Sequence, residues 1–315
     1  MYACLDLGSN SFHLLIARSC EGKAEIVERF SEKVQLGESV TSTGMISPQA
    51  FQRGVDCLTR FQNVIDNYPI ENCWTVGTNA LRIAHNAADF VDAARNVGFD
   101  VSIISGIQEA TLVYAGVTSA ILESDVLQMV IDIGGGSTEL IVGRGREPLW
   151  MQSLPVGCVS WRDDWFCTLP ADSSELERLL DEAVAAATAV FHTVLSELSN
   201  YHWVNSYASS GTAKMFSAVC EQSAPGIQGI SLEALIAMRP LIIRGVLTGN
   251  LLPGMPETRR ELILPGWAIL TALMQSFALS SINFSATALR EGMLDFMVKN
   301  KEPAIALAEF SSPSS

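Results

Sequence analysis

Two apolar segments on either side of a glycine-rich turn give the clearest pattern in this chain. Residues 129–143 read as one apolar strand, the turn Gly134-Gly135-Gly136, and a second apolar strand. A dinucleotide-binding fingerprint or a Walker loop would continue from its glycines into a helix, whereas this segment continues into a strand. The pattern therefore predicts a β-hairpin and argues against both of those nucleotide-binding motifs.

A weaker copy of the same pattern lies near the N-terminus. Residues 4–18 align with residues 130–144 without a gap, and the alignment places Asp6 opposite Asp132. A repeat of this size, with a strand-turn-strand at the start of each copy, predicts two related α/β domains with a ligand between their turns.

Strand-turn-helix patterns and one long helical pattern follow. Residues 74–82 and 101–110 each read as a buried strand, a turn and the start of a helix, which carries Arg82 in the first segment and Glu109 in the second. Residues 172–199 form an amphipathic pattern that opens with helix-capping residues.

The segment of residues 264–279 is the one candidate for a membrane span. It begins with Pro265 and Gly266, contains Gln275, and falls short of the ~20 residues that a bilayer requires. It therefore predicts a buried helix, and we expect no association with a membrane. The serine-rich residues 311–315 predict disorder.

The residues of the second hairpin suggest phosphate and metal binding. Glycines carry no Cβ, so they can adopt a positive φ and their amides can closely approach a bound anion. Phosphate is the anion that such a turn most naturally binds. Asp132 and Glu139 stand at one end of the hairpin and offer the hard oxygen ligands that suit Mg²⁺ or Mn²⁺. The alternative is an ordinary hairpin whose glycines only turn the chain and whose acids are solvated.

Composition limits the range of functions. A chain of 315 residues with 48% hydrophobic content is large enough for two domains, each with its own core. The net charge of -14 argues against a nucleic-acid-binding surface, which would be basic. The same charge disfavours long-range attraction of a polyanion, so a ligand of that kind would have to be captured by local cations.

The cysteines and histidines indicate neither disulfides nor zinc. The seven cysteines form no C-x-x-C pair and the sequence shows no signal peptide, which together predict a reducing cytoplasm. Cys158 reads as a small core residue in preference to a nucleophile. The four histidines are scattered without the spacing of zinc ligands.

Five short motifs in order carry a resemblance to a known family. They are D-x-G-S-N-S at 6–11, G-T-x-x-x-R at 77–82, I-S-G-x-x-E-A at 104–110, D-I-G-G-G-S-T-E at 132–139 and L-R-E-G at 289–292. In these motifs the chain closely resembles the exopolyphosphatase and guanosine pentaphosphate phosphohydrolase family. The resemblance implies an α/β fold of two ribonuclease H-like lobes, as in the actin, Hsp70 and sugar-kinase superfold, with the active site in the cleft between them.

The polar joint at residues 123–125 gives the domain boundary. We expect an N-terminal lobe over residues 1–124 and a C-terminal lobe over residues 125–288. As in short members of the family, a last helix over about 289–303 is expected to pack back on the first lobe. Residues 304–315 are expected to form a tail.

The resemblance assigns Glu109 as the general base that removes a proton from the attacking water. Burial among apolar neighbours such as Ile104 and Ile107 would raise its pKa and make it a better base. Its alternative role is a helix N-terminal acid favoured by the macrodipole. Arg82 matches an arginine that binds phosphate in the family, and its planar guanidinium suits two phosphate oxygens. A surface salt bridge is the alternative for Arg82.

The same motifs imply a metal and a set of phosphate contacts. Asp132 and Glu139 match the family's magnesium-site carboxylates, so Mg²⁺ or Mn²⁺ is the expected cofactor. Asp6 either holds the metal through water or only shapes the first turn. Phosphate is expected to contact backbone amides, small hydroxyls and one arginine, and no lysine is needed in the loop. The expected contact residues are Ser9, Asn10, Ser11, Arg82, Gly134, Gly135, Gly136, Ser137, Thr138, Gly211 and Thr212.

Some positions depart from the family pattern. The loop at residues 210–212 resembles one that approaches the ligand, although Ala208 replaces the glycine that usually precedes it. Residues 285–288 read Ser-Ala-Thr-Ala where the family usually places an aspartate, and Gln108 stands where an acid is common. Arg259 is a further candidate for phosphate contact.

The expected chemistry is release of one terminal phosphate per cycle from inorganic polyphosphate, by attack of a water that Glu109 activates. Guanosine pentaphosphate presents the same terminal group and is the alternative substrate. A sugar-kinase-like phosphotransferase and a non-catalytic sensor of polyphosphate or an alarmone are the other classes that this superfold allows. We expect no nucleic-acid partner, and the oligomeric state stays open, with a homodimer as one alternative.

Overall fold

The chain folds into two α/β units, each built on one sheet. This computed structural model describes residues 1–20, 23–121, 125–223 and 229–310. The first unit comprises Met1–Glu123, Met151–Ser153 and Thr287–Ser315, and the second comprises Ser124–Trp150 and Leu154–Ala286. The expected disorder at residues 311–315 and two residues of the joint at 123–125 lie outside the described residues.

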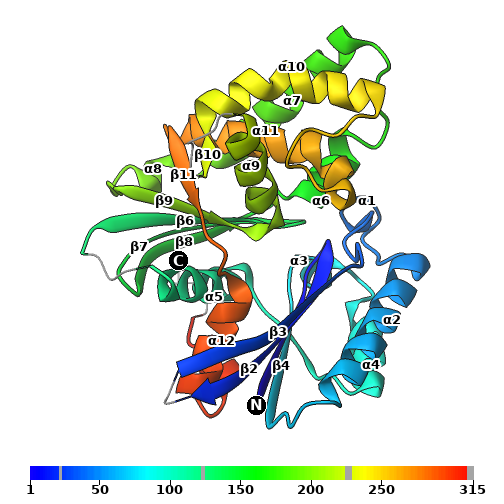
Figure 1. Cartoon of the computed structure of the whole chain (residues 1–315), viewed down its shortest axis with the longest axis vertical. Helices are drawn as coiled ribbons and strands as arrows, with labels where there is room; N and C mark the ends of the chain where they lie inside the picture. Colours follow the sequence, from blue (N-terminus) through cyan, green and yellow to red (C-terminus); the bar gives the residue numbers. More distant parts are fainter. Residues whose placement is uncertain (21–22, 122–124, 224–228, 311–315) are drawn as a thin grey trace. The chain divides into compact units, whose positions relative to one another are not determined.

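The first unit holds a five-stranded sheet in the order β3-β2-β1-β4-β5 (Figure 1). Its strands are β1 (Tyr2–Leu7), β2 (Ser11–Cys20), β3 (Lys23–Lys33), β4 (Asn72–Gly77) and β5 (Val101–Ile103). β1 is antiparallel to β2 and parallel to β4, and β4 is parallel to β5. The N-terminal strand-turn-strand is therefore present as predicted.

The second unit repeats this arrangement in a six-stranded sheet of order β10-β11-β9-β6-β7-β8. Its strands are β6 (Leu127–Ile133), β7 (Thr138–Arg144), β8 (Glu147–Leu154), β9 (Asn205–Ser209), β10 (Ile230–Ser231) and β11 (Ser281–Phe284). β6 is antiparallel to β7 and parallel to β9, and β9 is parallel to β11, so β8-β7-β6-β9-β11 matches β3-β2-β1-β4-β5. The predicted α/β fold with two ribonuclease H-like lobes is confirmed.

Helices cover both sheets. In the first unit they are α1 (Val40–Thr43), α2 (Pro48–Ile65), α3 (Asn79–Ile83), α4 (Ala87–Val97), α5 (Gly106–Ser119), α12 (Leu289–Lys299) and α13 (Pro303–Ala308). In the second unit they are α6 (Cys158–Trp165), α7 (Ser173–His192), α8 (Leu195–Leu198), α9 (Ser210–Ser223), α10 (Leu232–Thr248), the 3-10 helix η1 (Glu257–Leu262) and α11 (Ile263–Ser276).

Alternation along β1 sends its side chains to two helical layers. Leu5 and Leu7 join the core that includes residues of α2 and α4. Cys4 faces the other side, where its Sγ lies 3.4 Å from the Sδ of Met297 on α12. Because successive residues of a strand point to opposite faces, Asp6 lies on the same face as Cys4. α12 also packs against α5, so the last long helix belongs to the first unit.

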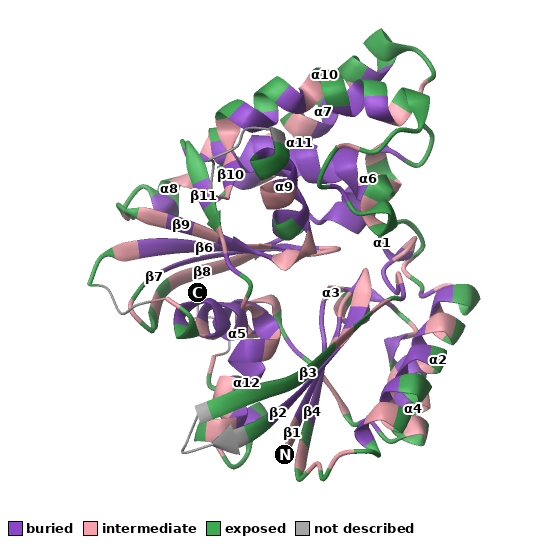
Figure 2. Ribbon diagram, in the orientation of Figure 1, coloured by how far each residue is buried: buried purple, intermediate pink, exposed green. Residues whose placement is uncertain are grey.

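α11 is the central helix of the second core. All of its residues from Ile263 to Met274 are buried, and Figure 2 shows them in purple. α7 and α10 pack against it, and the indole N–H of Trp267 donates to the carbonyl of Leu235 at 2.7 Å. The predicted buried helix is confirmed. None of the helices formed by the described residues combines the length and apolar character that crossing a bilayer requires.

The predicted helix at residues 172–199 is wrong in its length. Asp172 caps α7 as predicted and accepts hydrogen bonds from two amides of the first turn, at 2.9 and 3.0 Å. The helix ends at His192, however, and the short α8 follows separately. The hydroxyl of Thr193 donates to the carbonyl of Val190 at 2.6 Å, and such bonding by a β-branched residue disfavours continuation of the helix.

Part of the expected tail is helical. Residues 304–308 lie in α13, which begins at Pro303. Leu307 is only 1% exposed, and its carbonyl accepts a hydrogen bond from the side chain of Gln108 at 3.4 Å. Burial of this leucine gives the segment a packing role in the first unit.

Candidate functional site

The two hairpins have the same turn geometry. The last residues of β1 and β6 pair with residues five positions later, so the turns contain residues 8–11 and 134–137. A Cβ added to Gly8 or to Gly134 would lie 3.0 or 3.1 Å from the carbonyl oxygen of the fourth turn residue. Close approach of the backbone therefore favours glycine at the first position of both turns.

The carbonyls of the second turn are bound by the N-terminus of α6. The amides of Cys158 and Val159 donate to the carbonyls of Gly134 and Gly135, at 2.9 and 2.7 Å. In a trans peptide the N–H of one residue points opposite to the C=O of the residue before it. The amides of Gly135 and Gly136 therefore point away from α6, and two such adjacent amides can bind an anion.

Gly157 permits this contact between α6 and the turn. A Cβ at position 157 would lie 2.4 Å from the amide nitrogen of Gly136 and 2.5 Å from the carbonyl carbon and oxygen of Gly135. All three atoms belong to the backbone and cannot rotate away. Any larger residue at position 157 would therefore displace the turn.

The first turn is held in the same way, but by a loop after β3. The amides of Gln35 and Gly37 donate to the carbonyls of Asn10 and Ser9, each at 2.8 Å. The amides of Asn10 and Ser11 consequently point away from this loop. The side-chain amide of Asn10 donates to the hydroxyl of Ser11 at 3.3 Å, and Ser9 is 5% exposed. The three predicted contact residues of this turn thus lie together.

Three side chains form a row across the strand ends of the second sheet. Asp132 pairs in register with Glu139 on β7 and with Ser209 on β9. Residues paired in register point to the same face, so the carboxylates of Asp132 and Glu139 are neighbours. The hydroxyl of Ser209 donates to Oδ1 of Asp132 at 2.6 Å. Glu139 and Ser209 are fully buried, whereas Asp132 is partly exposed.

Two carboxylates of this row could hold a magnesium ion together with other ligands. Among the described residues, no three His, Cys, Asp or Glu side chains are grouped so that they could hold a metal ion. Magnesium is usually held by one or two carboxylates together with phosphate oxygens and water. Asp132 and Glu139 provide that number of hard oxygen donors. Asp6 of the first unit pairs in register with His13 and not with a second acid.

The predicted base Glu109 is buried in an ion pair with Arg82. Nη1 of Arg82 donates to Oε2 of Glu109 at 2.7 Å and to the carbonyl of Ile104 at 3.0 Å. Burial raises the pKa of Glu109 above its ordinary value, and the charge and hydrogen bond of Arg82 oppose that shift. Parts of the two alternative roles are present, because Glu109 stands in the first turn of α5 and Arg82 forms a salt bridge. With 10% and 18% of their side chains exposed, however, this is no surface pair.

Gln108 helps to position the start of α5. The hydroxyl of Ser105 accepts from the amide of Gln108 at 3.2 Å, and the side-chain carbonyl of Gln108 accepts from the amide of Ser105 at 2.9 Å. This is a reciprocal capping box, which an acid at position 108 would also complete. The departure from the family at this position therefore keeps the local geometry that presents Glu109.

The loop at the start of α9 lies against Arg259 of η1. A Cβ added to Gly211 would fall 1.7 Å from Nη2 of Arg259, so glycine makes room for the guanidinium. Burial lowers the pKa of Arg259 below its ordinary value. Within the described ranges, the side chain of Arg259 makes neither a hydrogen bond nor an ion pair. A partly desolvated guanidinium of this kind favours an anion nearby.

Two predicted contact residues use their hydroxyls within the protein. Thr138 donates to the carbonyl of Val156 at 2.5 Å, and the hydroxyl of Thr212 lies 3.2 Å from the sulfur of Cys158. Burial raises the pKa of Cys158 to about 11, so its thiol stays protonated. The packing role predicted for Cys158 agrees with its burial and not with a nucleophile.

Sequence reasoning missed Ser209 and Gly157. Ser209 comes directly before the loop at residues 210–212. Gly157 comes directly before α6, whose first amides contact the second turn. No sequence spacing relates Ser209 to Asp132, which is 77 residues away. Only the parallel pairing of β6 with β9 reveals that relation. The glycine in the segment Leu154-Pro-Val-Gly157 was the available signal for a close backbone contact.

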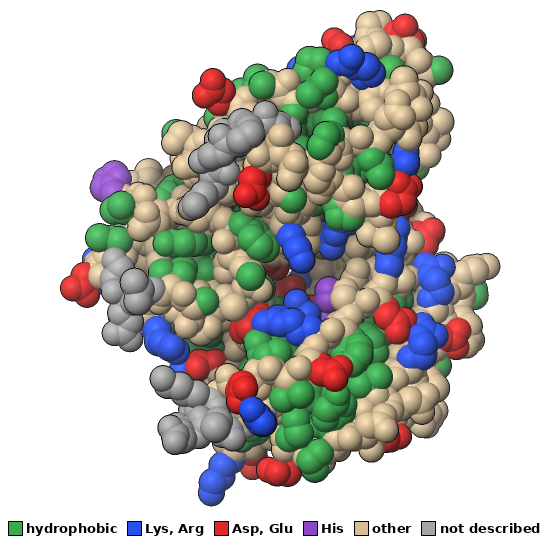
Figure 3. Space-filling model, viewed as in Figure 1, with side chains coloured by type: hydrophobic (Ala, Val, Ile, Leu, Met, Phe, Trp, Pro, Cys, Tyr) green, Lys and Arg blue, Asp and Glu red, His purple; other side chains and the backbone are tan. Residues whose placement is uncertain are grey.

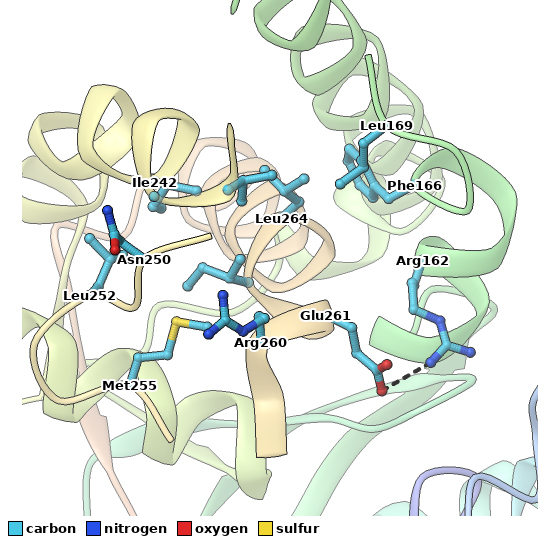
Figure 4. A pocket seen from close by; sticks show the side chains of 13 residues that line it. Arg162, Phe166, Leu169, Ile242, Asn250, Leu252, Met255, Arg260, Glu261 and Leu264 are labelled. Carbon is cyan, nitrogen blue, oxygen red and sulfur yellow. Dashed lines mark ion pairs between the residues drawn. The ribbon is translucent and has the colours of Figure 1, made fainter. Parts of the chain in front are cut away.

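A separate pocket in the second unit contains none of the predicted residues. It has a volume of about 270 Å³. Figure 4 shows Leu264, Ile242 and Phe166 on its apolar wall. At its polar end Arg162 contacts Glu261 at 3.2 Å. The pocket shares α6 and η1 with the loops described above but is distinct from them.

Comparisons with known proteins agree on one family. The profile of the Ppx/GppA phosphatase family matches residues 15–301. A Haemophilus influenzae protein provisionally named an exopolyphosphatase is 34% identical over 304 residues, which are 96% of this chain and 93% of that protein. A guanosine-5'-triphosphate,3'-diphosphate pyrophosphatase of Aliivibrio fischeri is 32% identical over 301 residues, 95% of this chain. The chain spans 59% of the length of that longer relative.

Solved structures give the same result. An exopolyphosphatase from Cytophaga hutchinsonii has a TM-score of 0.77 at 25% identity, over 95% of this chain and 97% of its own. A Ppx/GppA family member from Aquifex aeolicus has a TM-score of 0.71 at 25% identity, over 95% of this chain and 98% of its own. By sequence and by fold, this chain belongs to the Ppx/GppA phosphatase family.

Proposed function

We propose that this chain is an exopolyphosphatase-type hydrolase that releases the terminal phosphate of inorganic polyphosphate by attack of water. The observation that carries this proposal is the buried Glu109 held at 2.7 Å by Arg82. A general base must be positioned and must have a pKa that approaches the operating pH. Burial raises the pKa of Glu109 and so moves it in that direction.

The base acts through the carboxylate oxygen that does not contact Arg82. Oε2 of Glu109 accepts the hydrogen bond from Arg82, so we assign Oε1 as the atom that receives the proton from water. The water oxygen then bonds to the terminal phosphorus as the bridging P–O bond breaks. The electron pair of that bond stays on the shortened chain, which leaves as the anion.

Backbone amides and arginine would stabilise the charge that develops on phosphate. Cleavage of a phosphoanhydride spreads negative charge over the equatorial oxygens and the leaving group, so fixed donors can supply much of the catalysis. We assign this role to the amides of Gly135 and Gly136 in the second unit and of Asn10 and Ser11 in the first. Arg259 is the further cation that we assign to phosphate.

Local cations matter because the chain is acidic overall. With a net charge of -14, long-range forces repel a polyanion. On the face shown in Figure 3, Lys and Arg side chains are interspersed with Asp and Glu. Capture of polyphosphate would then depend on short-range contacts, which dominate within the Debye length of roughly 8 Å at physiological ionic strength.

Phosphatases of this family are generally metal-dependent. We assign Mg²⁺ or Mn²⁺ to Asp132 and Glu139, because the two carboxylates are paired in register beside the glycine turn. When bound, such an ion would neutralise charge on the phosphate oxygens. We assign Asp6 to shaping the first turn, since its in-register neighbour on β2 is His13.

We further propose a reducing, cytoplasmic setting for the reaction. The cysteines whose side chains the structure describes are all free thiols, and four of them are buried: Cys4, Cys57, Cys158 and Cys220. Buried free thiols are typical of proteins that work where disulfides do not persist.

Phosphate release from a substrate panel tests the proposed activity. The purified protein with Mg²⁺ is given polyphosphates of several chain lengths, guanosine pentaphosphate and ATP. We expect release of orthophosphate from polyphosphate without any added acceptor. Faster release from guanosine pentaphosphate would identify the nucleotide as the substrate, as the name of the Aliivibrio fischeri relative suggests.

The same panel separates the other functional classes. A sugar-kinase-like enzyme would transfer phosphate only when an alcohol acceptor is present. A sensor would bind polyphosphate with Mg²⁺ and release nothing. Either result would contradict the hydrolase proposal.

A further inference from the structure

Ser209 has a fixed and unusual position at the end of β9. It is fully buried, and it pairs in register with Asp132 across the parallel strands β9 and β6. Its hydroxyl donates to Oδ1 of Asp132 at 2.6 Å. Both residues belong to strands of one sheet, so regular backbone hydrogen bonds and not a loop fix their relative position.

The hydrogen bond limits how the Asp132 carboxylate can rotate. Oδ1 is held on the side of β9 by Ser209, while Glu139 stands in register on the other side, on β7. A carboxylate with one oxygen bound in this way presents a single preferred direction to a cation. The hydrogen bond therefore restrains the orientation in which Asp132 can offer its carboxylate to a cation.

The corresponding position in the first unit shows that the sheet itself does not need this hydroxyl. There Asp6 pairs in register with Val76 on β4, which has no hydrogen-bond donor in its side chain. The strand order and the turn length are nevertheless the same in both units. A serine at this position is therefore not required for the strand order or for the length of the turn.

We propose that Ser209 is a positioning residue, which orients Asp132 toward a divalent cation. The inference rests on the proposed function, because it needs a cation at Asp132 and Glu139. It adds a residue that lies in none of the five motifs, and its removal should change the affinity for the cation. Hydrogen-bond partners of metal ligands typically change metal affinity by about 10- to 100-fold when they are removed.

The test measures cation binding directly, in the absence of substrate. Mn²⁺ is titrated into the wild type and Ser209→Ala, and free Mn²⁺ is followed by electron paramagnetic resonance. We expect a Kd that is about 10-fold or more weaker in the variant. Ser206→Ala is the matched control, because Ser206 lies on the same strand, is 7% exposed, and pairs with Met129 and not with an acid. Its Kd should equal that of the wild type.

Ser209→Cys separates the hydrogen bond from simple filling of space. A thiol fills the position but donates only weakly, so this variant should also bind Mn²⁺ more weakly. In turnover assays both Ser209 variants should need more Mg²⁺ for half-maximal rate, and saturating Mg²⁺ should restore most of kcat. Wild-type Mn²⁺ affinity in Ser209→Cys, with weak binding only in Ser209→Ala, would overturn the inference.

Asp132→Ala distinguishes failure of this inference from failure of the proposed function. If Asp132→Ala abolishes Mn²⁺ binding while Ser209→Ala binds like the wild type, only the role of Ser209 is wrong. If Asp132→Ala itself leaves Mn²⁺ binding unchanged, the metal site and the role of Ser209 fail together.

Discussion

The two units build one hairpin twice and equip it differently. Asp6 and Asp132 occupy the same position at the end of the first strand of each sheet. In the first unit their neighbours in register are a histidine and a valine, whereas in the second they are Glu139 and Ser209. A repeated backbone therefore does not imply a repeated function. We assign the phosphate-binding amides to both units but the metal ligands to the second alone.

The units also differ in how the turn is held and in what else they contribute. A helix N-terminus binds the second turn, whereas a loop binds the first. The first unit in turn carries the buried ion pair of Glu109 and Arg82. The proposed base lies on one unit and the proposed metal ligands lie on the other. The comparison teaches that such a difference comes from side chains placed on the same backbone arrangement.

Replacing each of the two aspartates by alanine should give the largest difference in rate between the units. Asp132→Ala removes a proposed metal ligand, and we expect Mg²⁺-dependent phosphate release to fall by about 10³-fold, because charge stabilisation by a metal is worth several kcal/mol. Asp6→Ala removes an acid to which we assign only the shaping of a turn, and its rate should fall by less than about 10-fold. Steady-state kinetics over a range of Mg²⁺ concentrations measure both. Equal losses in the two variants would break the comparison and give Asp6 a direct metal role.

The pH dependence of the rate should report the ion pair of the first unit. Glu109 acts as a base only when deprotonated, so the rate should fall as the pH decreases through its pKa. Burial raises that pKa and Arg82 lowers it, so Arg82→Gln should move the acid limb to higher pH. The rate at neutral pH should also fall by about 10- to 100-fold, as expected for loss of a charged hydrogen bond.

The control for this pH profile is another arginine of the same unit. Arg60→Gln breaks an ion pair with Glu32 in which the arginine side chain is 55% exposed, so the acid limb should keep its position. An acid limb that Arg82→Gln leaves in place would show that Glu109 does not control the titration.

Substitution of Gly157 or Gly37, the glycines that contact the two turns, should give a smaller effect, and on stability. Gly157→Ala brings a Cβ to 2.4 Å from backbone atoms of the second turn, and we expect the free energy of unfolding to fall by about 1–3 kcal/mol. Gly37→Ala brings a Cβ to 2.7 Å from the Cβ of Ser9 in the first turn, a less severe approach than the one at Gly157, so its loss should be smaller. Urea unfolding with a constant m-value measures both. A larger loss of unfolding free energy for Gly37→Ala would contradict the closer contact that we describe at the second turn.

The sequence predicted those parts of the molecule whose interactions are local. Apolar periodicity, glycine turns and caps within a few residues predict three kinds of element. They are the two hairpins, the strand-turn-helix segments that carry Arg82 and Glu109, and the buried α11. The repeat also predicted the two-lobed fold, because similar sequences at residues 4–18 and 130–144 imply similar strand orders.

The remaining features depend on pairing between distant segments. Ser209 meets Asp132 only through the register of β9 with β6, and Arg259 meets Gly211 only through the packing of η1 against α9. No periodicity records such contacts. The end of α7 at His192 was also missed, because a helical pattern continues across the residues at which the hydrogen bonding changes.

Turnover and binding by Glu109→Gln test the central claim most directly. Glutamine keeps an oxygen to accept from Arg82 but cannot take a proton from water. With polyphosphate and Mg²⁺, we predict a fall in kcat of about 10²- to 10⁴-fold and an unchanged Kd for polyphosphate, with Glu25→Gln, an exposed partner of Arg18, as the control that retains activity. Wild-type kcat in Glu109→Gln would contradict the account, because the buried carboxylate would then have no part in activating water.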